Sequence, residues 1–429
     1  MEHTLSVEGA SGKMVQKKSI REWLGFSNIF DYEKARTLGA FFGWVLSVLA
    51  LIFIAISVIA LILYIQAAFG LGKYQHDRTG EALRNTGLVF AALVGIPFII
   101  WRAIVAARQV DVAAESLFND KISAASSDLN ARYEETSRLE VDGDFKQVNE
   151  WKADTVARSA AIDRLEGLAF ERRDTAPRIA RLLATYIKGS FPAVNVAPTV
   201  NIRRTVQPRI DLQFAVSALS RVHRIAREVD NSEWRLNLTH TNFDGVNFAG
   251  TYFYAADFSN SRFEGVNFVA ANLEGCKFSG CLLNYGRFIG ANMRGCRFDR
   301  AIINEPEPHP HGMVESINLA DIFGTTFVAA DIRALDYIGE REVLAATLAT
   351  SDTRLSKVIE DAMPALALRR SAMLYRADFR SNDRVTSAWE QLKATGFEYW
   401  LPFSSTDLML GNKLGQFRAE HGLDRFPYT

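Results

Sequence analysis

The chain has 429 residues, which is enough for two or three domains with a substantial buried core. Lysine and arginine together number 49, and aspartate and glutamate together also number 49, so the formal net charge is zero. This balance excludes a bulk electrostatic attraction to nucleic acid or to an acidic substrate, and partners have to be sought segment by segment.

The first third of the chain predicts a membrane region. Residues 1–36 combine a polar tail with a short stretch of mixed apolar and charged residues that suits an interfacial helix. Residues 37–72 contain no charged residue and exceed the roughly 20 residues that a bilayer needs. A second apolar run, 86–101, continues past Arg102, whose charge can snorkel to the headgroups. Residues 37–108 are therefore predicted to form a two-helix transmembrane hairpin, with the lipid bilayer as a partner.

Charge and cysteine usage predict the orientation of this hairpin. Basic residues flank its outer ends more than its connector, which favours both termini and the repeat described below in the cytoplasm of a multi-pass protein of the cell (inner) membrane. The cysteines are Cys276, Cys281 and Cys296, and unpaired thiols suit a reducing compartment. A buried disulfide between Cys276 and Cys296, which lie twenty residues apart, is the alternative.

Helical periodicity follows the apolar runs. Residues 109–192 predict a cytoplasmic helical stalk, interrupted at 141–143 and ended by Phe191-Pro192. Residues 193–209 form a proline-containing linker, and 210–235 predict a helix that caps the open strand edges of the segment that follows. The spans or the stalk could also hold a homo-oligomer.

From residue 236 onward a large apolar residue returns every fifth position, and a small residue stands two positions before it. A period of five fits neither a helix nor a plain strand, so the chain must turn within each unit and stack on itself. Glycine or asparagine often follows two positions later, where a tight turn is needed. The predicted structural core of the repeat is Leu238, Phe243, Phe248, Phe253, Phe258, Phe263, Phe268, Leu273, Phe278, Leu283, Phe288, Met293, Phe298 and Ile303.

Written as A(D/N)(L/F)XX, with Ala271-Asn272-Leu273 as an example, the repeat closely resembles the pentapeptide-repeat family. The resemblance implies a right-handed quadrilateral β-helix with four pentads per coil, in which residues twenty apart stack. The joining of two apolar runs to a helical segment, a linker and the repeat further resembles the bacterial two-transmembrane-helix pentapeptide repeat-containing membrane proteins. Two phenylalanine ladders are then expected, Phe258, Phe278, Phe298 and Phe248, Phe268, Phe288.

The repeat is expected to continue beyond an insertion. Residues 304–316 break the period and are predicted to bulge out as a loop, after which the repeat resumes and runs to 336. Residues 337–429 predict a C-terminal helical cap whose aromatic residues, among them Phe426 and Tyr428, cover the last coil. The predicted fold class is a membrane α-hairpin plus an all-β quadrilateral β-helix, the pentapeptide-repeat solenoid of 236–336, with a helical stalk and caps.

The sequence offers no credible active site. His309 and His311 could ligate a metal, but no cysteine or further histidine stands near them, and an exposed loop is the simpler interpretation. Nucleophile-elbow, phosphate-loop and zinc-protease motifs are missing. We therefore predict a protein that is not an enzyme, without catalytic, cofactor-binding or metal-binding residues.

The functional prediction is a membrane-anchored, non-enzymatic protein–protein interaction scaffold that presents a cytoplasmic rod, with unidentified protein partners on the solenoid walls. One alternative is a topoisomerase-inhibiting DNA mimic, since the best-known soluble members of the resembled family display an acidic rod. Residues 236–303 carry five acidic and six basic residues, a net charge of about plus one that cannot imitate a phosphate rod, and no nucleic-acid partner is expected. A second alternative is a membrane-pore effector triggered through the rod.

Overall fold

The computed structural model describes residues 33–69, 79–141, 144–193, 208–303, 320–333, 341–367 and 382–429. The chain divides into two compact units, residues 1–119 and 120–429, and each is described by itself. Most of the predicted tail and interfacial helix, most of the 193–209 linker, and the 304–316 loop with His309 and His311 lie outside the described residues.

The first unit consists of α2 (Glu33–Ala68) and most of α3 (Thr79–Asp128). Among the residues that the structure describes, no helix has both the length and the apolar character needed to cross a membrane. The predicted two-span hairpin at 37–108 is therefore not supported. For α3 the physical reason is that its uncharged apolar run lies between Arg84 and Arg102 and is shorter than the roughly 20 residues that a bilayer needs.

The segment predicted as a wholly helical stalk contains a β-hairpin. β1 (Arg132–Val141) pairs in antiparallel fashion with β2 (Asp144–Ala153), with Arg132 opposite Ala153. The sequence contains a strong signal for a two-residue hairpin turn in the dipeptide Asp142-Gly143, and the prediction of a wholly helical stalk with a break at 141–143 is wrong. The abundant charged residues around it, which lack a clear apolar alternation, concealed the strands.

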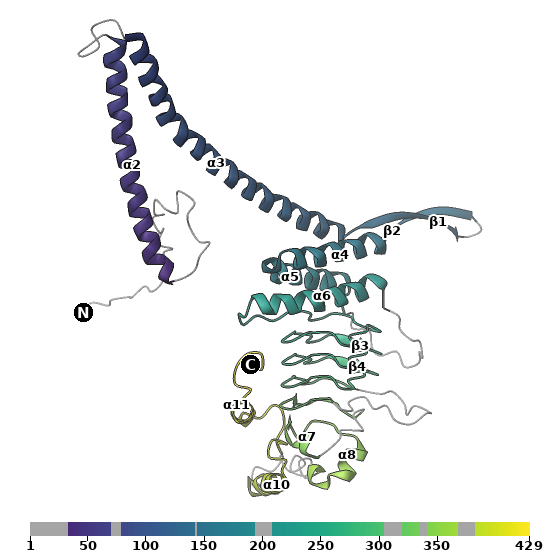
Figure 1. Ribbon diagram of the computed structural model, residues 1–429. Helices are drawn as coiled ribbons and strands as arrows, with labels where there is room; N and C mark the ends of the chain where they lie inside the picture. Colours follow the sequence, from purple (N-terminus) through teal and green to yellow (C-terminus); the bar gives the residue numbers. More distant parts are fainter. Residues whose placement is uncertain are drawn as a thin grey trace, which may run out of the picture. The chain divides into compact units, whose positions relative to one another are not determined.

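Three helices form a layer above the first coil of the solenoid (Figure 1): α4 (Thr155–Glu171), α5 (Ala176–Ser190) and α6 (Ile210–Val229), with the short η2 (Arg173–Thr175) between the first two. Asp154 begins α4 by accepting a hydrogen bond from the Ala157 N–H at 2.9 Å, a standard N-cap. Their apolar faces, represented by Ile162, Leu183 and Leu219, are fully buried.

The repeat forms a quadrilateral β-helix, because parallel bridges join residues twenty apart and each coil therefore contains four pentads. Asn272, for example, bridges Tyr252 in the coil before and Asn292 in the coil after. The longer pairs are β3 (Arg262–Glu264) with β4 (Leu282–Asn284). The predicted ladders are present: the rings of Phe258 and Phe278 stack at 5.2 Å, those of Phe278 and Phe298 at 4.9 Å, those of Phe248 and Phe268 at 4.9 Å, and those of Phe268 and Phe288 at 5.0 Å.

Local chemistry explains the repeat motif. Where an Asn or Asp precedes the large residue, its side chain accepts a hydrogen bond from the N–H two positions later, as Asn292 does from Arg294 at 3.1 Å. Such an Asx turn bends the chain at the edge of each wall. The residue that completes the corner lies in the left-handed region, with φ +65° at Gly250 and +54° at Ala270. Glycine is favoured there because it has no Cβ to clash.

The insertion does not interrupt the ladder. Asn292 bridges Asp321, which is 29 residues later instead of 20, so the undescribed segment accommodates nine additional residues. Ile322, Phe327 and Ile332 then return to the interior with at most 1% exposure. β5 (Thr326–Phe327) pairs in parallel with β6 (Leu348–Ala349), and Ala349 bridges Trp400. The predicted helical cap at 337–429 therefore contributes further rungs as well as helices.

The helices of this region are α7 (Arg341–Ala345), α8 (Lys357–Ala362), η3 (Pro364–Ala367), α10 (Asn382–Ala394) and α11 (Met409–Glu420). Trp400 is fully buried, and its indole N–H donates to the Leu344 carbonyl at 3.0 Å. Tyr399 and Phe403 join a core cluster with Leu348 of the final coil. These aromatic residues cover the end of the solenoid as expected.

Residues 421–429, here called the C-terminal strap, run back along one corner of the solenoid, and the C-terminus lies beside the coils (Figure 1). Pro427 lies against Gly275, and Tyr428 lies against Gly295. The ring of Phe426 is 6.3 Å from that of Tyr254 in the first coil. The prediction that Phe426 and Tyr428 cover the last coil is therefore wrong. Phe426 and Tyr254 are far apart in the sequence, and no sequence pattern indicates that the end of the chain packs against the first coil.

Replacing a corner glycine by alanine should destabilise the solenoid to a different extent at different corners. Gly275 (φ +67°) and Gly290 (φ +64°) have the same backbone conformation, and Gly290→Ala should lower the free energy of unfolding by about 1 kcal/mol through that conformation alone. Gly275→Ala should lower it further, because its Cβ would come within 2.5 Å of Pro427. Chemical denaturation of both variants measures the difference.

The reciprocal substitution is the control. Ala270 is exposed and already strained at φ +54°, so Ala270→Gly should raise the free energy of unfolding. Equal losses for Gly275→Ala and Gly290→Ala would show that the strap does not pack on this corner.

Candidate functional site

All fourteen predicted core residues lie in the interior of the solenoid, each with at most 4% of its surface exposed. They hold the coils together and are not accessible to a partner. The surfaces that remain for recognition are the outward-pointing residues on either side of each large residue. The functional question is therefore which of the four solenoid walls are open.

The three cysteines are structural. Their thiols are buried and free, and each donates to a carbonyl of the preceding coil, as Cys276 does to Phe253 at 2.9 Å. The hydroxyl of Ser261 makes the same bond to Leu238 at 3.0 Å. Burial raises the pKa of each thiol well above its usual range. The alternative of a disulfide between Cys276 and Cys296 is not realised, and thiols in this state are poor nucleophiles.

We name the four walls by the bridged residues that run along them. Wall A carries Asn242, Arg262, Leu282 and Ile302; wall B carries Asn247, Asn267 and Arg287; wall C carries Tyr252, Asn272, Asn292 and Asp321; wall D carries Asp257, Lys277, Arg297 and Thr326.

Wall C is bordered by the C-terminal strap along its corner with wall D. The hydroxyl of Tyr428 donates to Glu274, and the ring of His421 lies 5.3 Å from that of Phe323. Arg235 fastens the strap at the corner between walls C and D, because its guanidinium donates to the carbonyls of Gly275 at 2.8 Å and Thr429 at 3.0 Å. These contacts obstruct the edge of wall C that adjoins wall D.

Wall D is covered at its far end by α11. Val328, which follows Thr326 on this wall, is buried in one cluster with Phe417 of α11. Burial lowers the pKa of Lys277, and the charges of Arg235 and Arg297 lower it further, so this wall is also crowded with cations. The chain itself therefore occupies much of walls C and D.

Walls A and B carry exposed apolar and charged side chains. Within the described part of the repeat, the large apolar residues with substantial exposure are Tyr285 at the corner between these walls, 38% exposed, and Ile302 on wall A, 42% exposed. Leu282 is bridged to Ile302 and partly exposed beside it. Arg262 pairs with both Asp244 and Glu264, so neither carboxylate on this wall is unpaired.

The open edge of the first coil is capped by side chains of α6. The Gln213 amide accepts from the Asn247 N–H at 2.8 Å and donates to the Asn247 carbonyl at 3.0 Å, so it replaces a peptide group of a missing coil. Ser220 accepts from the Tyr252 N–H at 2.8 Å, and His223 Nε2 lies 2.8 Å from the Tyr254 carbonyl. The capping helix is predicted from the sequence, but Gln213 and Ser220 are not predicted as its polar contacts.

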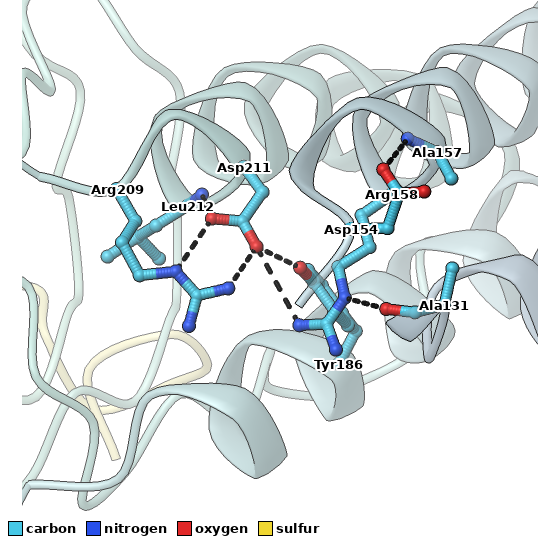
Figure 2. A network of polar contacts seen from close by, with 8 residues as sticks. All are labelled: Ala131, Asp154, Ala157, Arg158, Tyr186, Arg209, Asp211 and Leu212. Atoms are coloured by element: carbon cyan, nitrogen blue, oxygen red, sulfur yellow. Dashed lines mark hydrogen bonds and ion pairs between the residues drawn. The ribbon is translucent and has the colours of Figure 1, made fainter. Parts of the chain in front are cut away.

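A buried polar network joins the helical cap to the base of the β-hairpin (Figure 2). Asp211 is fully buried and accepts from Arg209 at 3.1 and 2.5 Å and from the Tyr186 hydroxyl at 2.9 Å. Arg158 approaches the same carboxylate at 3.8 Å and donates through Nε to the Ala131 carbonyl at 3.0 Å. Burial, followed by the hydrogen bond to Asp211, raises the pKa of Tyr186 to about 12. The phenol therefore stays protonated at neutral pH.

Among the described residues, no group of three or more histidine, cysteine, aspartate or glutamate side chains is placed to hold a metal ion. The histidine with the most unusual environment is His223, whose Nδ1 lies buried without a hydrogen-bond partner. Its surroundings are those of a structural capping residue, with the Trp234 ring at 5.4 Å.

Comparison with known proteins supports the interpretation of the repeat. Residues 235–307 match the family model described as a pentapeptide repeat region. The solenoid is thus supported as a pentapeptide repeat. The comparison with curated proteins gave no match. The resemblance to two-transmembrane-helix members of the family has no support from these comparisons.

Solved structures with similar coils share little sequence with this chain. QnrB1, a plasmid-mediated fluoroquinolone resistance protein, is 15% identical, and the match covers 29% of this chain and 80% of QnrB1 with a TM-score of 0.16. HetL, involved in heterocyst differentiation regulation in the cyanobacterium Nostoc sp. strain PCC 7120, is 15% identical over 32% of this chain and 55% of HetL, with a TM-score of 0.13. A thylakoid-lumen pentapeptide repeat protein of Arabidopsis thaliana is 20% identical, and the match covers 21% of this chain and 68% of the Arabidopsis protein with a TM-score of 0.10. Similarities this low carry no argument about function.

His223 should make the fold sensitive to mild acid. Burial lowers its pKa from about 6.5 to about 4, so the unfolded chain binds the proton more readily and stability falls as the pH drops from 6.5 towards 4. Between pH 7 and pH 5 the histidine should remove about 2 kcal/mol of the free energy of unfolding. In His223→Gln this contribution should disappear, as measured by urea unfolding at both pH values.

His240 is the matched control, because it is exposed at a corner of the same solenoid. His240→Asn should retain the pH dependence of the unchanged protein. An identical loss between pH 7 and pH 5 in His223→Gln and in His240→Asn would contradict the assignment.

Proposed function

We propose that this protein is a non-enzymatic interaction scaffold that binds protein partners on walls A and B of its pentapeptide-repeat solenoid. The observation that carries the proposal is that, among the described residues, the C-terminal segment packs along the corner of walls C and D, whereas the exposed large apolar side chains of the repeat lie on walls A and B. Repeat solenoids commonly use such extended surfaces for binding. Partly exposed Leu282, Tyr285 and Ile302 supply apolar contact area next to the Arg262 ion pairs.

The charges on these walls also bear on the DNA-mimic alternative. An acidic rod requires unpaired carboxylates along its surface. In this solenoid Asp244 and Glu264 pair with Arg262, and Asp299 pairs with Arg297 at 3.1 Å. Wall B carries Arg287 without a neighbouring acidic residue in its bridged row. The electrostatic pattern favours a protein partner with mixed apolar and polar character.

Site-specific photo-crosslinking in the native host tests the proposal. A benzophenone amino acid at Arg287 on wall B should yield protein adducts, and the same amino acid at Arg294 beside the strap on wall C should yield at least tenfold less. Ile302→Asp should reduce the adducts formed from position 287, because a charge would replace an exposed apolar contact. Adducts formed mainly from position 294 would contradict the assignment of the open walls.

A second proposal concerns α2, which we infer to contact a lipid bilayer. Large apolar side chains are exposed around its whole circumference, including Leu51 at 67%, Ile54 at 58% and Ile59 at 57%. Such a surface requires an apolar covering. We predict that this contact occurs at the inner membrane. Both termini and the β-helix are predicted to lie in the cytoplasm. A homo-oligomer formed through these helices is the competing occupant.

Vesicle flotation of the full-length chain tests the lipid contact. Leu51→Lys combined with Val58→Lys should release the protein from phosphatidylcholine vesicles, because each lysine costs about 3 kcal/mol in an apolar environment. The control combines Val110→Lys with Val112→Lys, two equally exposed positions of α3. Equal flotation of both double variants, or monodisperse solubility without lipid, would contradict this proposal.

A further inference from the structure

A groove with a volume of about 650 Å³ lies in the second unit, between the base of the β-hairpin and α5. Its walls come from the end of α3, the paired ends of β1 and β2, α4, α5 and the residue before α6. Three of the lining residues are arginines, Arg132, Arg158 and Arg209, and none is an aspartate or a glutamate. This groove is separate from the solenoid walls, and nothing in the scaffold proposal uses it.

The charge of the groove exceeds what the surrounding structure neutralises. Asp211 beneath it pairs with Arg209 and approaches Arg158, so one carboxylate stands against three guanidinium groups. The C-terminal ends of α3 and α5 also border the groove, and each contributes a partial negative charge of about one half. Together these terms leave an excess of about one positive charge. Arg132 and Arg209 are exposed, whereas Arg158 is buried.

Two of the three arginine side chains of the groove are held in fixed positions by hydrogen bonds and ion pairs. Arg158 is only 6% exposed and is fixed by the Ala131 carbonyl and by Asp211, while Arg209 grips the same carboxylate with two hydrogen bonds. Figure 2 shows both guanidinium groups converging on Asp211 from different segments of the chain. Pre-positioned arginines of this kind suit planar recognition of phosphate or carboxylate oxygens without further ordering.

The other residues that line the groove indicate which chemical groups a bound anionic ligand would carry besides its negative charge. A volume of 650 Å³ is in the range of small-molecule sites and far exceeds the space of a lone anion. Trp151 on β2 lines the groove with 65% of its surface exposed, and Leu182 of α5 adds an apolar patch. Thr185 and Ser190 supply hydroxyl groups for a polar ring or sugar. An exposed indole beside guanidinium groups favours a planar ring that stacks on it.

We propose that this groove binds a nucleoside phosphate, with its phosphate at Arg132 and Arg158 and its base against Trp151. The phosphate carries up to two negative charges and is attracted by the positive surplus of the groove, and the exposed Arg132 is expected to contact it. Tyr186 remains neutral at the floor and does not oppose the anion.

Isothermal titration of the full-length chain at constant salt tests the site with three probes: adenosine monophosphate, inorganic phosphate and adenosine. The nucleotide should bind most tightly, because only it engages both the arginines and Trp151. Arg132→Gln should weaken nucleotide binding about tenfold or more, the usual effect of losing a charge-assisted hydrogen bond. The control Arg181→Gln removes an equally exposed arginine of α5 outside the groove and should leave the affinity within about twofold.

Trp151→Leu separates the two halves of the site, since it should abolish the preference for the nucleotide over inorganic phosphate and leave phosphate binding unchanged. Melting temperatures verify that these exposed substitutions leave the fold intact. The proposal is overturned if adenosine binds as well as the nucleotide, if no probe binds at millimolar concentration, or if Arg132→Gln and Arg181→Gln weaken binding equally.

Discussion

The coil-to-coil ladder of the solenoid is the constraint on which the rest of the second unit depends. Each pentad must bury one large residue, place its backbone groups opposite those of the next coil, and turn a corner within five residues. The aromatic stacks near 5 Å and the bridges at intervals of twenty express the same repeat distance.

A ladder of this kind has two exposed ends, and the protein closes them by different means. At the first coil, side chains of α6 replace the missing backbone: Gln213 makes the two hydrogen bonds of a peptide group, and Ser220 and His223 each satisfy one more. At the last coil, irregular segments add rungs as far as Trp400, and an aromatic cluster completes the core. Satisfied edges also prevent edge-to-edge aggregation.

The same C-terminal segment that closes the solenoid also decides which surfaces are free. Because the strap runs back along one corner, it places Pro427 and Tyr428 against glycines that have no side chain to exclude them. Arg235 then holds the end of the chain by its carbonyl groups. Stability and recognition are thereby linked, since among the described residues the contacts that fasten the strap also obstruct the corner between walls C and D.

The sequence by itself determined the features that repeat locally. The period of five specified the buried positions, the corners and the stacking interval, because each of these depends on residues within one or two pentads. Tertiary structure alone decided the features that join distant segments. The return of Tyr428 to Glu274, the pairing of Ala349 with Trp400, and the meeting of Arg158, Tyr186 and Asp211 connect residues with no common periodicity. Such contacts depend on how packed elements fit together in space, and a pattern along the chain contains no record of that fit.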